Sequence, residues 1–221
     1  MISKRLKAIA DFLDINDFIV DVGTDHALLP IYLIKNNLVN GIIATDINKS
    51  ALNNAITNIY KARLQHKIST VLSDGLENVD INLVNTIVIS GMGTKNIIKI
   101  LKNKEKTKNI NKIIVQSNNN YYHLRKNITA MGFYIADEDI VFDNKNYYLT
   151  VLFKKGHKKY KDKDFYWGII KPGNINYYKS LQKNYNDIFR SIPNVRISKK
   201  VRMLILVKQL NKIINYCRNY L

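Results

Sequence analysis

Short β-branched runs alternate with longer amphipathic runs over the first two thirds of the chain, and this alternation restricts the fold more than any other feature. The predicted strands are residues 18–22, 42–46, 68–72, 86–90 and 112–116, and the predicted helices are residues 26–36, 49–61, 95–102 and 121–131. Strands and helices that alternate at this spacing are typical of βαβ units. The sequence therefore predicts an α/β fold with five parallel strands.

The alternation of strand and helix patterns ends after residue 132. Residues 133–142 and 147–153 are two further strand patterns, joined only by Asp143-Asn144-Lys145-Asn146. So short a connection makes an antiparallel hairpin, because a parallel crossover needs about a dozen residues. Nicotinamide-binding Rossmann domains usually continue with a sixth parallel strand, whereas S-adenosylmethionine (SAM) domains commonly end in such a hairpin. We therefore expect a Rossmann-like class I methyltransferase sheet.

The last third of the chain has a helical pattern. Apolar residues recur at steps of three and four in two runs: Tyr178, Leu181, Tyr185, Ile188 and Ile192, then Met203, Val207, Leu210, Ile214, Cys217 and Leu221. Both runs are heptad seams. They predict a C-terminal helical hairpin or coiled coil, so we expect a methyltransferase domain at residues 1–156 and a helical domain at 157–221.

Positive charge is concentrated in that helical third. Residues 1–154 hold 19 Lys and Arg against 14 Asp and Glu, whereas residues 155–221 hold 16 against 3. Codon bias can raise the lysine content of the whole chain, but it does not explain why acidic residues are so few after residue 154. A basic patch of this kind attracts polyanions, which favours a nucleic-acid partner.

Other classes of protein are disfavoured by what the sequence lacks. The one cysteine excludes a disulfide framework. No apolar run approaches the roughly 20 residues of a membrane span, and the N-terminus has no signal-peptide cleavage site. The four histidines are scattered without metal-ligand spacing. We expect a cytoplasmic protein without a metal, a membrane contact or an obligate protein partner.

The stretch "IVDVGTDHALLP" at residues 19–30 covers the first strand-to-helix turn. Gly23 allows close approach of a ligand to the backbone, but Asp25 and His26 stand where a phosphate-binding turn would have further glycines. Asp25 would repel a pyrophosphate and favour a cationic cofactor such as SAM, with its sulfonium and ammonium groups. The alternatives are that Asp25 caps the following helix and that His26 is a buried, hydrogen-bonded residue.

Polar residues also follow the later strands. Asp46 suits the two hydroxyls of an adenosine ribose, and Asp74, followed by Gly75, can accept the amino hydrogens of adenine, although a plain turn is the alternative. Gly91 and Met92 begin a tight turn after the fourth strand. After the fifth strand, Gln116 and Asn118 offer amide groups that can read the edge of a base.

The pieces "DVGTDHALLP", "TDIN", "SDGL", "ISGMGT" and "QSN", in this order, resemble the bacterial tRNA (adenine(22)-N1)-methyltransferase family. The resemblance runs from about Ser3 to Phe153. It implies SAM-dependent methylation of N1 of an adenine in the D-arm region of tRNA. It implies cofactor contacts at Gly23, Asp46, Ile47, Asp74, Gly75, Gly91 and Met92. Catalytic or substrate roles follow for Asp25, His26 and Asn118, and Arg5 matches a family arginine that reaches the substrate.

The chain departs from the family pattern at Thr94, where glycine is usual, and at Ser117, where proline is usual. Two other functions stay open from the sequence. One is a SAM-dependent methyltransferase acting on another RNA or DNA base, although the Pro-Pro stretch of many such enzymes is missing after the fourth strand. The other is a non-catalytic RNA-binding adaptor on a Rossmann-like domain, which would not bind SAM.

Overall fold

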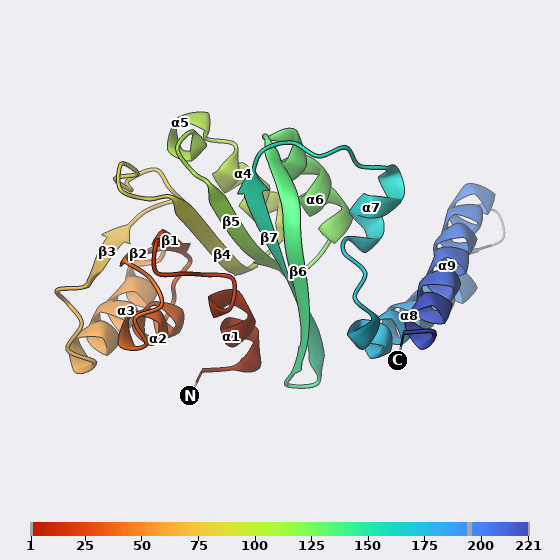
Figure 1. Ribbon diagram of the computed structural model, residues 1–221, viewed down its shortest axis with the longest axis horizontal. Coiled ribbons are helices and arrows are strands. Elements are labelled where there is room, and N and C mark those ends of the chain that lie inside the picture. Colours follow the sequence, from red (N-terminus) through yellow and green to blue (C-terminus); the bar gives the residue numbers. More distant parts are fainter. Residues whose placement is uncertain (1, 194–195, 221) are drawn as a thin grey trace. The chain divides into compact units, whose positions relative to one another are not determined.

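The computed structural model describes residues 2–193 and 196–220 and forms two compact units, Met1–Gly168 and Ile169–Leu221. The first unit contains a sheet with the strand order β3-β2-β1-β4-β5-β7-β6 (Figure 1). Its strands are β1 (Phe18–Val22), β2 (Gly41–Asp46), β3 (Ile68–Leu72), β4 (Thr86–Met92), β5 (Lys112–Ser117), β6 (Phe133–Asp143) and β7 (Asn146–Lys155). The strands β1 to β5 are parallel, and β7 runs antiparallel to both of its neighbours. The predicted fold class is confirmed.

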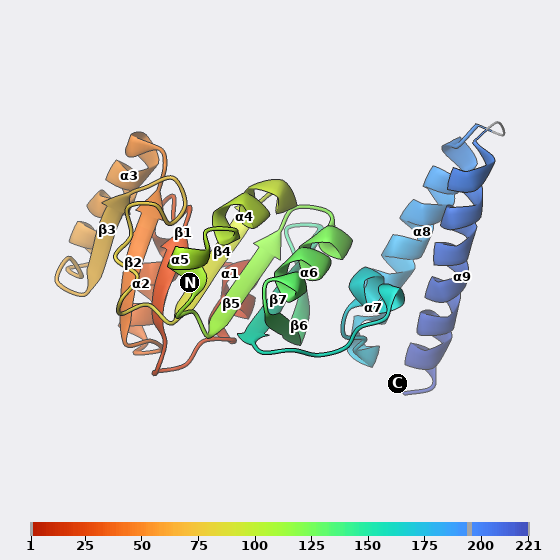
Figure 2. The same ribbon diagram turned by 90° about the horizontal axis from the view of Figure 1, so that it is seen from above.

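Helices cover both faces of this sheet. They are α1 (Lys4–Ala10), α2 (Leu28–Lys35), α3 (Lys49–Lys61), α4 (Thr94–Leu101), α5 (Lys104–Thr107), α6 (Tyr121–Ala130) and α7 (Asp162–Trp167). Helices α1, α2 and α3 share one hydrophobic core with Val88 of β4 and Ile114 of β5. Neighbouring residues on a strand face opposite sides, so Ile87 and Ile113 lie on the other face, where Figure 2 shows α4 and α6. All four of these side chains are buried.

The hairpin turn is tighter than the sequence predicts. Only Asn144 and Lys145 connect β6 to β7, and both have positive φ values of 45° and 65°. Two left-handed residues form a turn whose twist matches that of the flanking strands. Pairing therefore continues to Asp143 and Asn146, so the four-residue connection was wrong and both strands are longer.

The segment between residues 157 and 168, which the sequence analysis places in the helical domain, packs on the first unit. The Tyr122 hydroxyl donates to Asp162 Oδ1 at 2.6 Å, and Arg125 Nη1 donates to the Phe165 carbonyl at 2.9 Å. Arg125 also forms an ion pair with Glu138, with 2.6 Å between Nε and Oε1, and both side chains are 2% exposed. The boundary between the two compact units falls after Gly168.

The second unit is a short 3-10 turn, η1 (Pro172–Asn174), followed by the helices α8 (Ile175–Ser191) and α9 (Ile197–Arg218), which pack on each other. The predicted helical hairpin is confirmed. Of the predicted seam, Tyr178, Leu210, Ile214 and Cys217 are buried, as are Leu206 and Ile213, whereas Ile188 is 44% exposed. Leu221 lies outside the described residues.

Within residues 2–193 and 196–220, no helix is both long and apolar enough to span a membrane.

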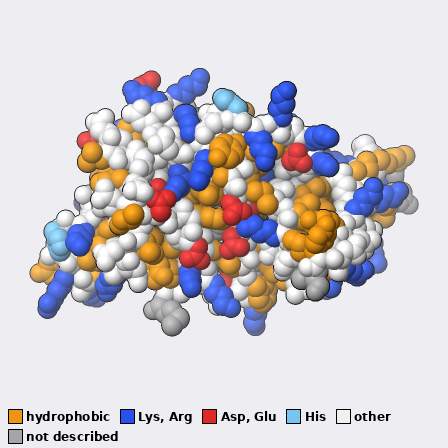
Figure 3. Space-filling model, in the orientation of Figure 1, with side chains coloured by type: hydrophobic (Ala, Val, Ile, Leu, Met, Phe, Trp, Pro, Cys, Tyr) orange, Lys and Arg blue, Asp and Glu red, His pale blue; other side chains and the backbone are white. Residues whose placement is uncertain are grey.

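Asp and Glu side chains gather over the first unit on the face shown in Figure 3. The second unit holds 11 Lys and Arg and one acid, Asp187. The two units therefore carry different charge densities.

Candidate active site

Two cavities adjoin at the carboxyl ends of β1 and β4, where they share Gly23, Ser90 and Gly91. The first, the β2–β3 cavity, has a volume of about 490 Å³ and extends past the ends of β2 and β3. The second, the α1–β1 cavity, has a volume of about 310 Å³ and extends toward α1. Ligands of open parallel sheets bind at this edge.

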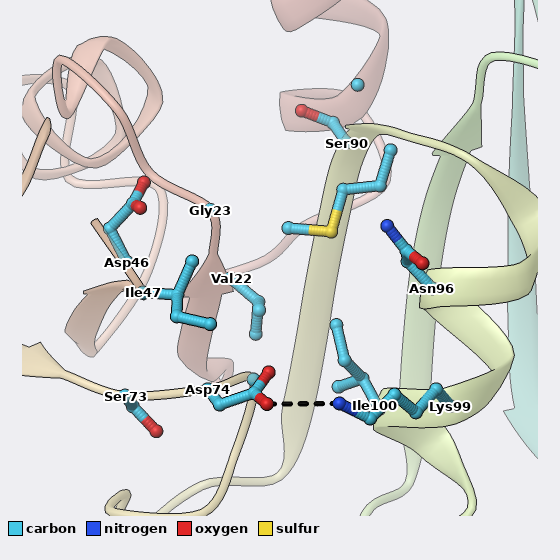
Figure 4. Close-up of a pocket in the computed structure, with 13 residues that line it drawn as sticks. Val22, Gly23, Asp46, Ile47, Ser73, Asp74, Ser90, Asn96, Lys99 and Ile100 are labelled. Carbon is cyan, nitrogen blue, oxygen red and sulfur yellow. Dashed lines mark hydrogen bonds and ion pairs between the residues drawn. The ribbon is translucent and has the colours of Figure 1, made fainter.

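Every residue that the sequence analysis assigns to the cofactor lines the β2–β3 cavity: Gly23, Asp46, Ile47, Asp74, Gly75, Gly91 and Met92. Figure 4 shows Asp46 and Ile47 on one side of this cavity and residues of α4 on the other. The ends of neighbouring parallel strands meet at one edge, so residues far apart in sequence converge here.

Gly23 has a backbone conformation that other residues rarely adopt. Its φ is +77°, and a Cβ at this position would also push aside the terminal methyl group of Met92. The neighbouring strand β2 holds this turn in place, because the backbone N–H groups of Gly23 and Thr24 both donate to the Thr45 carbonyl at 2.9 Å. A side chain here would therefore displace the turn or fill the cavity.

Two carboxylates face the β2–β3 cavity. Asp46 accepts from the Asn48 N–H at 2.9 Å and from the Asp25 N–H at 3.2 Å, which fixes its orientation. Asp74 Oδ2 is 3.0 Å from Lys99 Nζ of α4, and this ion pair crosses the cavity in Figure 4. Both partners are partly exposed, so the pair contributes little to stability.

Helix α4 contributes a wall of this cavity that was not predicted from the sequence. Asn96, Lys99 and Ile100 line the β2–β3 cavity and stand three and four residues apart, which places them on one face of a helix. That spacing was visible in the sequence. Only the packing of α4 against the strand ends, however, shows that this face meets the cavity.

The α1–β1 cavity carries both signs of charge, with Asp21 and Asp25 on one hand and Arg5 on the other. Asp21 is 5% exposed and accepts from the Thr24 hydroxyl at 2.8 Å. Burial raises the pKa of this carboxyl to about 6, against the lowering effect of the Thr24 hydrogen bond. A nearby cation would favour its charged form.

Asp25 and His26 lie at the mouth of this cavity. Asp25 Oδ2 is 3.7 Å from His26 Nε2, and the side chains are 66% and 51% exposed. Asp25 does not cap α2, which starts at Leu28 after Ala27; Asp25 and Ala27 have left-handed φ values of 51° and 54°. The capping and burial alternatives for these two residues were wrong, and both side chains are free to meet a ligand.

Arg5 is held in place by the end of β5. Its Nη1 donates to Gln116 Oε1 at 3.1 Å, and its guanidinium lies 5.5 Å from the centre of the Tyr148 ring. Gln116 is 2% exposed, and its amide nitrogen donates to the Ser117 carbonyl at 3.1 Å. Gln116 therefore orients Arg5 and does not itself offer a free amide.

Asn118 lies beside the shared rim of the two cavities. Its Nδ2 donates to the Gly91 carbonyl at 2.7 Å, and its backbone N–H donates to the Met92 carbonyl at 2.9 Å. The side chain is exposed. Its amide oxygen therefore remains available to an incoming base.

The two departures from the family pattern contact each other. The hydroxyls of Thr94 and Ser117 are 2.9 Å apart, and both residues are buried. The Thr94 hydroxyl donates its hydrogen to the Asn119 carbonyl at 2.5 Å, so the Ser117 hydroxyl is the donor in the bond between the two side chains. This pair joins the turn after β4 to the turn after β5.

In the part of the chain that the structure describes, no three His, Cys, Asp or Glu side chains come together in a way that could hold a metal ion. Among the same described residues, the buried hydroxyl groups of Thr45 and Thr150 have no hydrogen-bond partner.

Comparison with known proteins finds several methyltransferases. A family described as a methyltransferase domain matches residues 2–151. A Mycoplasma genitalium protein assigned to the tRNA methyltransferases is 31% identical over 218 residues, 96% of each chain. The tRNA (adenine(22)-N(1))-methyltransferase of Bacillus subtilis is 30% identical over 158 residues, which is 71% of this chain and 66% of that protein.

A solved structure is also similar over nearly the whole chain. It is that of M. capricolum TrmK in complex with S-adenosylhomocysteine, the product form of the cofactor. The TM-score is 0.83 with 30% sequence identity, and the match covers 99% of this chain and 98% of that one. The likeness therefore includes both compact units.

Proposed function

The chain belongs to the tRNA (adenine(22)-N1)-methyltransferase family, and we propose that it transfers a methyl group from SAM to N1 of adenine 22 in tRNA. The observation that carries the proposal is the convergence of Gly23, Asp46, Asp74 and Met92 around one cavity of about 490 Å³. A cavity of this size at the switch point of a parallel sheet suits a nucleoside cofactor.

The residues of the β2–β3 cavity fit the adenosine end of SAM. The Asp46 carboxylate is oriented by two backbone N–H groups and can accept from both ribose hydroxyls. Asp74 can accept from the adenine amino group once Lys99 moves aside, since their ion pair is exposed. Gly23 lines this cavity without a side chain, so the cofactor can lie against the turn.

The α1–β1 cavity fits the methionine end of SAM, which carries an ammonium and a carboxylate. Asp21 would face the ammonium group and Arg5 the carboxylate, because both line this cavity. This placement assigns Arg5 to the cofactor, whereas the sequence analysis assigned it to the tRNA. The sulfonium would then lie at the shared rim formed by Gly23 and Gly91.

When bound, SAM supplies an electrophilic methyl group that the N1 lone pair of adenine attacks in line. The protein's task is to hold the base at the right place and angle. Asn118 can accept a hydrogen from the exocyclic amine with its amide oxygen. Asp25 stabilises the positive charge that develops on the ring. No protein nucleophile is needed, and Cys217 is buried in the helical unit.

Product analysis tests this function. The protein is incubated with SAM and an unmodified tRNA transcript that has adenine at position 22, and the digest is analysed by mass spectrometry. We expect 1-methyladenosine, which disappears when adenine 22 is replaced by guanine. A different methylated nucleoside would indicate another target base, and absence of SAM binding would favour the adaptor.

A further inference from the structure

A third cavity lies between the N-terminal ends of α4 and α6 and has no role in the cofactor site proposed above. This α4–α6 cavity has a volume of about 680 Å³, and its polar lining includes Asn96, Asn119, Asn120, Asn127, Lys95 and His123. It shares Asn96 with the β2–β3 cavity, so the two cavities are neighbours at the same edge of the sheet.

The charge of this cavity differs from that of the other two. Asp46 and Asp74 line the β2–β3 cavity, and Asp21 and Asp25 line the α1–β1 cavity. The lining of the α4–α6 cavity contains no acidic residue, and its charged side chain is Lys95. The helix ends at the cavity add a positive potential. The cavity therefore suits an anion, whereas the other two suit groups that donate hydrogens or carry positive charge.

Side-chain amides supply the second part of the chemistry. An amide offers a donor and an acceptor side by side, the pattern that matches the edge of a nucleobase. Asn96 and Asn127 come from α4 and α6, and Asn119 comes from the turn after β5. A ligand that combines a negative charge with such an edge is a nucleotide.

The floor of the cavity is held rigidly. Thr94 lines it and is 3% exposed, with its hydroxyl bonded to the Asn119 carbonyl at 2.5 Å and lying 2.9 Å from the Ser117 hydroxyl. The backbone N–H of Thr94 donates to Asn119 Oδ1 at 3.2 Å. The Asn119 amide is therefore fixed through its oxygen, and its NH₂ group is left to donate to a ligand.

We propose that the α4–α6 cavity binds the tRNA nucleotide adjacent to the target adenine, with Lys95 on its phosphate and Asn119 on its base. The proposal rests on the proposed function. Adenine N1 lies on the edge that pairs with another base, so the base must be unpaired to react, and enzymes that extrude a base also contact the flanking nucleotides. The α4–α6 cavity places Lys95 and several side-chain amides beside the cofactor cavity, where they can receive such a neighbour.

A double-mutant cycle that combines changes in the protein with changes in the tRNA tests the proposal. Transcripts with an abasic nucleotide at position 21 or 23 are compared with the intact tRNA by measuring Kd in the presence of S-adenosylhomocysteine, so that no turnover occurs. We expect one of the two abasic sites to weaken binding to the unaltered protein about tenfold or more. Asn119→Ala removes most of that penalty, whereas the exposed Asn54→Ala in α3 preserves it.

A second variant separates phosphate from base. Lys95→Gln should weaken binding of all transcripts alike and reduce the slope of log K against log salt by about 1, whereas the exposed Lys67→Gln leaves the slope unchanged. Affinity for S-adenosylhomocysteine stays as in the unaltered protein in all four variants.

The proposal is overturned if neither abasic site weakens binding, or if the penalty survives in Asn119→Ala and Lys95→Gln keeps the full salt slope. An equal loss of cofactor affinity in Asn119→Ala also overturns it, because the residue would then only maintain the fold of the turn. The proposed function fails separately, through the absence of 1-methyladenosine in the product of the unaltered protein.

Discussion

Asp21 is a buried carboxyl that weakens the fold at neutral pH. Its pKa is raised to about 6 from a reference of 3.8. The folded state therefore prefers the protonated acid, and the cost grows as the pH rises from 3.8 to 6 and is complete above 6, at about 3 kcal/mol. We predict that Asp21→Asn raises the free energy of unfolding by up to that amount at pH 8 and changes it little at pH 4. Urea titrations at the two pH values measure this; an equal change at both would contradict it.

The same carboxyl makes cofactor binding depend on pH. If Asp21 faces the SAM ammonium group, binding requires its ionised form and lowers its pKa. The affinity for SAM should then fall up to tenfold for each pH unit below about 6 and be constant above pH 7. Calorimetric titration from pH 5 to 8 measures the effect. Asp21→Asn should bind more weakly and without this dependence, and an unchanged pH profile in that variant would rule out the placement.

Asp25 is expected to act on the reaction and not on the cofactor. Its side chain is 66% exposed and its φ is 51°, a conformation that asparagine also tolerates. Asp25→Asn therefore keeps the turn and removes the charge. We predict a loss of about 10²- to 10³-fold in kcat with an unchanged Kd for SAM. Arg5→Ala is the contrasting variant, since it should raise that Kd. A parallel loss of cofactor affinity in Asp25→Asn would make Asp25 a cofactor residue.

Among the secondary-structure elements, the bounds of a helix were predicted well where a residue next to it in the sequence caps it. The helix at residues 49–61 has its predicted bounds, because the Asn48 side chain accepts from the Ser50 N–H at its start. The helix predicted at 26–36 begins at Leu28 instead, because the turn before it is left-handed at Asp25 and Ala27. That turn is held by Asp46, a residue from the next strand.

The candidate site likewise contains residues that could be predicted from the sequence and contacts that could not. The carboxyl ends of parallel strands lie at one edge of the sheet, so the convergence of Gly23, Asp46 and Asp74 there could be predicted from the sequence. Lys99 and the bond between Thr94 and Ser117 depend on how α4 and β5 pack. Such contacts are tertiary, and no local pattern in the sequence specifies them.

The attachment of α7 depends on one buried ion pair. Arg125 binds Glu138 and the carbonyls of Phe165 and Tyr166. We predict that Arg125→Met lowers the free energy of unfolding by about 3–5 kcal/mol, because it removes the guanidinium that offsets the charge of the buried Glu138 carboxylate. Arg125→Met with Glu138→Gln should recover a large part of this loss. Denaturant titration of both variants measures the difference, and equal stabilities would indicate that the ion pair is not responsible.

Across the whole molecule, the highest density of positive charge and the proposed cofactor cavities are on different units. Residues 169–221 hold 11 Lys and Arg and a single acid, whereas the proposed cofactor cavities belong to the first unit. We infer that the helical unit supplies much of the electrostatic attraction for tRNA. Each lysine that neutralises a phosphate adds about 1 to the slope of log K against log salt. The exposed lysines Lys179, Lys183, Lys208 and Lys212 are the ones to change.

We predict that replacing these four lysines by glutamine weakens tRNA binding at low salt and lowers the salt slope by about 1 for each phosphate that is no longer neutralised. The control replaces four exposed lysines of the first unit, Lys35, Lys61, Lys67 and Lys102, and has the same net charge. The two variants have the same total charge. A larger decrease of the salt slope in the helical variant therefore shows that the helical unit binds the phosphates, whereas equal decreases indicate only the long-range field of the whole protein. An unchanged slope in the helical variant would contradict the assignment of phosphate binding to these lysines.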